Sequence, residues 1–108
     1  MAGVVPQNRG NRSATRIGSA MSRKLRTAGW NISPSGRKHK HEGIFVSAQG
    51  DHVSIMVDLG YYGKNVHTAD LIFSDIIKWD CVPDNARLST SDQVCFIHFE
   101  YQRPKAKS

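Results

Sequence analysis

The sequence lacks the features that mark membrane, secreted and disulfide-stabilised proteins. No apolar run approaches the roughly 20 residues that a membrane-spanning helix needs. The first ten residues have neither the charged region nor the apolar region of a signal peptide. We therefore expect a soluble, cytoplasmic protein that does not bind membranes.

Cysteine is scarce, with only Cys81 and Cys95 among 108 residues. Because the two are not spaced as a Cys-x-x-Cys motif, the sequence predicts neither a disulfide framework nor a cysteine-based zinc site. Two buried, reduced thiols are the favoured interpretation.

Acidic residues are absent from the first 41 positions, which carry nine Lys or Arg residues. Residues 42–101 hold all nine acids against three Lys or Arg residues, and the last seven residues add three more cations. This asymmetry favours a polyanion-binding arm on a mildly acidic body, or a basic surface that attracts an acidic surface.

Length and composition predict one domain with a modest core. Residues 1–11 are small, polar and basic, so we expect a disordered basic arm there. Residues 12–102 are expected to form a single α+β domain, and residues 103–108 a basic tail.

Two segments have helical periodicity. Ser13 suits an N-cap and the apolar pattern after it predicts a helix over residues 13–28. A second helix is expected within residues 67–83, ended by Pro83, with a strand through residues 70–73 as the alternative. The apolar stripe of the first helix consists of Ala14, Ile17, Met21, Leu25 and Ala28.

Alternating apolar residues predict strands between and after these helices. Residues 30–33 form a short expected strand, residues 43–60 a hairpin and residues 94–101 a final strand, with a loop over residues 83–93. The predicted order is α-β-β-β-α-β, a small, mainly antiparallel sheet with two helices packed on one face.

Basic side chains gather on one side of the first expected helix. Four arginines project within about 80° of each other at helical spacing. No acid stands three or four positions from any of them, whereas an ordinary solvated face mixes charges. An ordinary solvated face and a binding face both remain open. The four are Arg12, Arg16, Arg23 and Arg26.

The stretch GRKHKHEG, residues 36–43, is a second basic region and is expected to form a loop between strands. We expect Arg37, Lys38 and Lys40 to reach across a nucleic-acid groove while the helix arginines contact backbone phosphates. Further phosphate contacts are expected from Lys64, Arg103 and Lys105.

The same stretch contains His39 and His41, which would point to one side of an extended chain as a chelating pair. Three cations in the loop oppose a divalent ion, so no metal and no cofactor is predicted. His98 alternates with apolar residues and is expected to be a hydrogen-bonded sheet histidine.

The glycine-containing stretch GYYGKN, residues 60–65, lies between an expected strand and an expected helix. It does not have Walker A spacing, so a strand-to-helix turn that uses glycine φ values is favoured over a phosphate loop. Tyr61 and Tyr62 could stack on bases if they are exposed.

No catalytic constellation is recognisable, and we expect the protein not to be an enzyme. Asp70, Asp75 and Asp80 are scattered around the second helix by their spacing, and no serine stands in a nucleophile elbow. The favoured function is largely sequence-independent nucleic-acid binding, to DNA or RNA. The alternative is a protein-interaction module, such as an inhibitor or adaptor of a mobile element, or a charge-complementary homo-oligomer.

Overall fold

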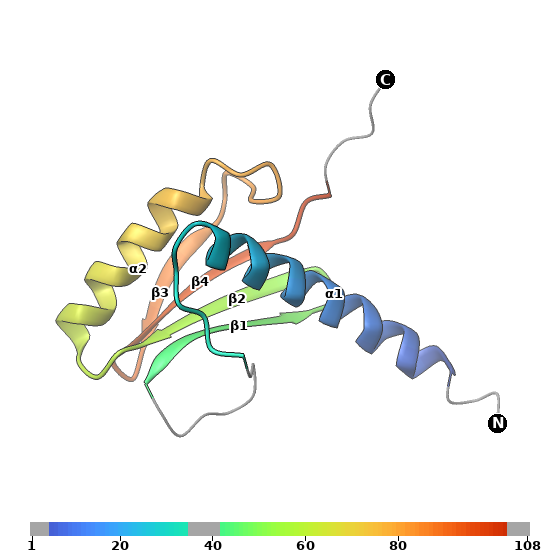
Figure 1. The fold of residues 1–108 in the computed structure, drawn as a ribbon, viewed down its shortest axis with the longest axis horizontal. Helices are drawn as coiled ribbons and strands as arrows, with labels where there is room; N and C mark the ends of the chain where they lie inside the picture. Colours follow the sequence, from blue (N-terminus) through green and yellow to red (C-terminus); the bar gives the residue numbers. More distant parts are fainter. Residues whose placement is uncertain (1–4, 35–41, 104–108) are drawn as a thin grey trace.

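The computed structural model describes residues 5–34 and 42–103, which form two helices and a four-stranded sheet. The sheet is antiparallel throughout, has the strand order β1-β2-β4-β3, and carries both helices on one face (Figure 1). This confirms the α+β class, but the order of elements is α-β-β-α-β-β. The elements are α1 (Val5–Thr27), β1 (Gly43–Gln49), β2 (His52–Asp58), α2 (Tyr62–Ile76), β3 (Arg87–Ser91) and β4 (Val94–Glu100).

The hairpin expected within residues 43–60 is confirmed as β1 and β2, and β2 ends at Asp58. The chain reverses at Gly50, whose φ of 59° is a conformation that glycine adopts without strain. Alternation along β2 buries Val53, Ile55 and Val57 completely, because one face of the strand meets the helices. Burying these side chains is the main stabilising contribution of the central sheet.

Strand β3 was expected to be loop, and that prediction is wrong. All its residues are exposed, so the segment lacks the apolar alternation by which a strand is recognised. Its position is set by a tight turn to β4, in which Asp92 and Gln93 have φ values of 51° and 67°. Two consecutive residues with positive φ give the turn geometry that joins antiparallel strands by two residues.

The expected strand over residues 30–33 is also wrong, since only one parallel bridge, Ile32 to Ile44, forms there. The chain turns at Gly29, whose φ is 104°, and the Ile32 side chain that follows is buried in the core. Pro34 follows and has no N–H to continue a ladder. The segment is therefore a connection that touches the edge of β1.

Helix α1 begins at Val5 and not at Ser13. Pro6 falls in its first turn, where a missing N–H costs nothing, so this proline permits the start of the helix. The segment expected to be a disordered arm is thus helical from Val5 onward, and residues 1–4 lie outside the described residues. Ile17, Met21 and Leu25 are buried as predicted, whereas Ala28 is exposed.

Helix α2 confirms the second expected helix, and the alternative of a strand through residues 70–73 is wrong. Ala69, Ile72 and Ile76 are buried at helical spacing. The helix ends at Ile76, well before Pro83, because the chain passes into turns from Ile77 onward.

Asn65 is the buried polar side chain of the core, with 1% of its surface exposed. Its carboxamide oxygen accepts a hydrogen bond from the backbone N–H of Leu59 at 2.5 Å, and its amide donates to the carbonyl of Gln93 at 2.5 Å. These two bonds connect the end of β2, the first turn of α2 and the turn between β3 and β4.

Both cysteines are free and buried, as the sequence predicted. Burial raises the pKa of the Cys81 thiol, which disfavours the reactive thiolate. We expect neither thiol to react with a disulfide reagent in the native protein, and both to react after unfolding in guanidinium chloride. A count of modified thiols by intact-mass spectrometry measures this, and rapid native labelling of Cys81 or Cys95 would contradict the described packing.

Candidate nucleic-acid interface

Helix α1 carries Lys or Arg at six positions and no acidic residue. Its buried stripe faces the sheet, so the opposite side projects away from the body of the protein. Arg16 and Arg23 lie on that side with exposed side chains, and no ion pair joins either of them to an acid of the described residues. We call Arg16, Arg23 and Arg26 the arginine face.

Arg26 differs from the other two because it also holds the fold together. Its Nη2 donates a hydrogen bond to the carbonyl of Ile32 at 3.0 Å, across the turn that ends α1. The residue was predicted to lie against backbone phosphate, and a change of charge at this position would also disturb the turn. Tests of the arginine face are therefore best made at Arg16 and Arg23.

Contacts of two tryptophans hold the carboxyl end of α1 against α2 and against the turn that follows α2. The indole N–H of Trp30 donates to the Asp75 carboxylate at 2.8 Å, and the Lys24 ammonium lies 5.0 Å from the centre of the Trp79 ring. A cation at this distance over an indole ring is stabilised by the ring's electron density. The arginine face is thus presented on a helix with a fixed orientation.

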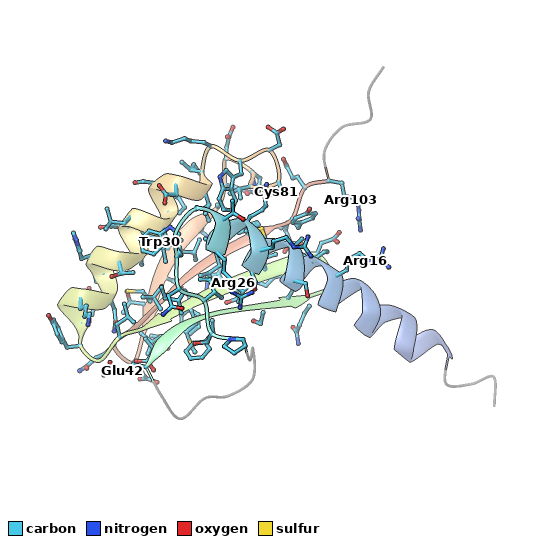
Figure 2. The ribbon with its side chains drawn as sticks, in the orientation of Figure 1. Arg16, Arg26, Trp30, Glu42, Cys81 and Arg103 are labelled. Atoms are coloured by element: carbon cyan, nitrogen blue, oxygen red, sulfur yellow. The ribbon has the colours of Figure 1, made fainter. Side chains whose placement is uncertain are left out.

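The other predicted contacts are dispersed or lie outside the described residues. Arg103 lies towards the same end of the molecule as Arg16 (Figure 2), where its guanidinium approaches the Asp51 carboxylate at 3.7 Å. Lys64 is exposed in the first turn of α2, which begins at the opposite end of the fold from the start of α1 (Figure 1). Nothing is described for the side chains of Arg12, Arg37, Lys38, Lys40, Lys105, His39 and His41.

Two tyrosines follow β2 and are exposed, as stacking on bases would require. Tyr61 is 62% exposed and Tyr62 is 53% exposed. The preceding Gly60 has a φ of 104°, which confirms a strand-to-helix turn that uses glycine. They lie beside Lys64 at the start of α2, away from the arginine face.

Strands β2, β3 and β4 place a polar cluster on the sheet face away from the helices. The His52 Nδ1 lies 2.8 Å from the Glu100 carboxylate, and the His98 Nε2 lies 3.1 Å from the Ser89 hydroxyl. His98 is therefore the hydrogen-bonded sheet histidine that was expected. Alternation along the strands places each histidine outward, but the pairing of β2 with β4 and the presence of β3 were not readable from the sequence.

Acidification is expected to destabilise the protein through His98. Burial lowers the pKa of this imidazole, and the positive charges of His52 and Arg87 lower it further. Since the folded-state pKa lies below the unfolded value of about 6.5, the unfolded chain binds more protons as the pH falls through that value. The free energy of unfolding should therefore decrease below about pH 6.5.

Urea unfolding of the wild type and of His98→Gln, each at neutral and mildly acidic pH, measures this effect. Glutamine does not titrate and can still bond to Ser89, so the variant should lose less stability on acidification. An equal loss in both proteins would show that other groups cause the acid sensitivity.

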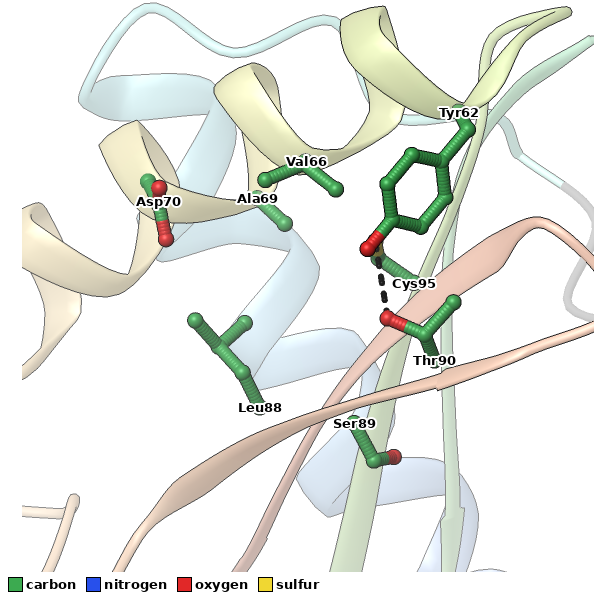
Figure 3. Close-up of a pocket in the computed structure, with 8 residues that line it drawn as sticks. All are labelled: Tyr62, Val66, Ala69, Asp70, Leu88, Ser89, Thr90 and Cys95. Atoms are coloured by element: carbon green, nitrogen blue, oxygen red, sulfur yellow. Dashed lines mark hydrogen bonds between the residues drawn. The ribbon is translucent and has the colours of Figure 1, made fainter.

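A small pocket of about 150 Å³ lies between α2 and β3, lined in part by Tyr62, Asp70 and Leu88 (Figure 3). The Thr90 hydroxyl lies 3.7 Å from the Cys95 sulfur at its base. No Lys or Arg of the described ranges lines the pocket, so it does not extend the arginine face.

Among the described residues no helix is both long and apolar enough to cross a membrane. In comparisons with known proteins, no protein family, no curated protein and no solved structure matches the chain. The candidate interface therefore rests on the geometry and charge of the chain itself.

Proposed function

We propose that this is a small, non-enzymatic protein that binds nucleic acid through the arginine face of α1. The observation that carries the proposal is a pair of exposed arginines, Arg16 and Arg23, that form no ion pair with an acid of the described residues, on a helix that contains no acid. We also propose that the protein is cytoplasmic. The other predicted cations, in the arm, loop and tail, would add further phosphate contacts.

The spacing of the two arginines suits a polyphosphate backbone. They are seven positions apart, which corresponds to roughly 10 Å along a helix at about 1.5 Å per residue. Because duplex DNA carries about one charge per 1.7 Å of its axis, both guanidinium groups can meet different phosphates of one duplex. Such contacts position a protein without reading bases, so we expect little sequence preference.

Fluorescence anisotropy with labelled duplex DNA, single-stranded DNA and duplex RNA tests the proposal across a range of salt concentrations. If about six phosphates are engaged, affinity should fall roughly a thousandfold between about 50 and 200 mM salt. If the arginine face acts alone with about three contacts, the fall should be only about fortyfold. The salt dependence thus measures how far the arm, loop and tail take part.

Absence of binding to all three ligands at low salt would overturn the proposal. Arg16 and Arg23 would then have to meet an acidic protein surface, either on a partner or on a second copy of this chain. Sedimentation at low and high salt would reveal self-association of that kind.

A further inference from the structure

The sheet face away from the helices contains a pocket of about 230 Å³ that the arginine face does not include. His52, Arg87, His98 and Glu100 come from this face of β2, β3 and β4, and Asn85 comes from the loop before β3. Phe99 is the core residue between His98 and Glu100. The pocket is lined by His52, Asn85, Arg87, His98, Phe99 and Glu100.

A carboxylate fixes the orientation of His52 at the rim of this pocket. The Glu100 Oε2 lies 2.8 Å from His52 Nδ1, so the carboxylate accepts the Nδ1 hydrogen and leaves Nε2 as the free ring nitrogen. The His52 side chain is 48% exposed, which keeps Nε2 accessible to a ligand.

His98 forms the wall beside His52 and does not supply a charge. Its ring stacks on that of His52, with centroids 5.7 Å apart, while its Nε2 is occupied by Ser89. The other nitrogen, Nδ1, is buried without a hydrogen-bond partner among the described residues. Adding a proton there would bury an unpaired N–H, so His98 is held in its neutral form.

Arg87 supplies the permanent positive charge. It is the direct cross-strand neighbour of His98, it is exposed, and no acid of the described residues forms an ion pair with it. Glu100, the acid of the pocket, is already engaged by His52. No three metal-ligating side chains converge in the described part of the chain, and a guanidinium opposes a cation, so an anion is the complementary ligand.

We propose that this pocket binds a phosphate group, held by the Arg87 guanidinium, with the Asn85 amide as a neutral donor and the free His52 Nε2 beside it at the rim. A guanidinium presents two parallel N–H donors that match two phosphate oxygens. The phosphate belongs either to a free nucleotide or to a nucleic-acid chain. The site does not depend on the proposed function of α1, because it lies on the opposite face of the sheet.

NMR titration of the full chain with inorganic phosphate, followed at the histidine ring nitrogens, tests the proposal. Sulfate is titrated in parallel as a second tetrahedral anion. We expect saturable shifts of the His52 signals with both anions. Absence of any saturable shift up to about 50 mM of either anion would overturn the site.

Two variants and one control connect the binding to named residues. Arg87→Gln should weaken the binding of both anions about tenfold or more, as expected for loss of a charged hydrogen-bond pair. His52→Gln should weaken the binding of both anions less than Arg87→Gln, because it leaves the guanidinium in place. Lys78→Gln removes the same charge from an exposed residue that follows α2, so a loss equal to that of Arg87→Gln would show general charge attraction and refute the pocket.

The source of the phosphate is distinguished by comparing a nucleoside monophosphate with an oligonucleotide that carries or lacks a 5′-phosphate. Because α1 variants at Arg16 and Arg23 leave the pocket intact, they separate the two proposals. If Arg87→Gln loses phosphate binding but keeps normal duplex binding, the pocket binds phosphate independently of the arginine face.

Discussion

Reversing the charge of Arg16 and Arg23 together should weaken duplex binding by about a hundredfold or more at about 0.1 M salt. Each change removes one phosphate contact and places a carboxylate against the polyanion. The slope of log affinity against log salt should fall by about 1.8, which is two contacts at about 0.9 each. Both side chains are exposed and lack ion-pair partners among the described residues, so folding should be preserved.

The matched control compares the single variants Arg23→Glu and Lys78→Glu, which change the net charge equally. Lys78 is exposed beyond the end of α2, so its reversal should alter affinity only through the general field of the protein. Circular dichroism and urea unfolding check that each variant is folded. Unchanged duplex affinity in the Arg16 and Arg23 double variant, or equal effects of the two single variants, would refute the arginine face as the site.

Replacement of Asn65 by leucine should lower the free energy of unfolding by about 2–4 kcal/mol, although leucine is similar in size. The change leaves the Leu59 N–H and the Gln93 carbonyl without their described partner. An orphaned buried polar group costs about 1–3 kcal/mol, and the Gln93 carbonyl lies nearer to solvent. Urea unfolding measured by circular dichroism gives the difference.

Two further variants make this prediction specific. Asn65→Asp keeps an acceptor for Leu59 but buries a charge and loses the donor to Gln93, so it should regain stability as the pH falls and the carboxyl becomes neutral. Ser74→Ala changes an exposed position of α2 and should alter stability by less than about 0.5 kcal/mol. A leucine variant as stable as Ser74→Ala would show that Asn65 does not brace the fold.

Periodicity predicted the elements whose buried and exposed faces differ. The stripe of Ile17, Met21 and Leu25, the alternation of β2 and the outward position of His98 all follow from residue spacing. Strand β3 has no such contrast, because an edge strand with every residue exposed resembles a polar loop. It is a strand because it pairs with β4, to which the two-residue turn at Asp92 and Gln93 connects it.

The candidate sites divide in the same way. The arginine face is a property of one helix, so spacing within α1 was enough to group Arg16 with Arg23. The sheet pocket needs side chains from three strands, and no local pattern brings His52, Arg87 and Glu100 together. The structural role of Arg26 was also hidden, because its bond to Ile32 depends on how the chain turns after α1.

Trp30 and Trp79 are two intrinsic fluorophores that lie beside the carboxyl end of α1. They are the chain's only tryptophans. Trp30 follows α1 and donates a hydrogen bond to Asp75 of α2, and Trp79 lies under the ammonium group of Lys24 of α1. A polyanion that docks on α1 would change the field around both indoles, whereas phosphate in the sheet pocket would act on the far side of the sheet. Intrinsic emission therefore reports occupancy of the helix surface without a label.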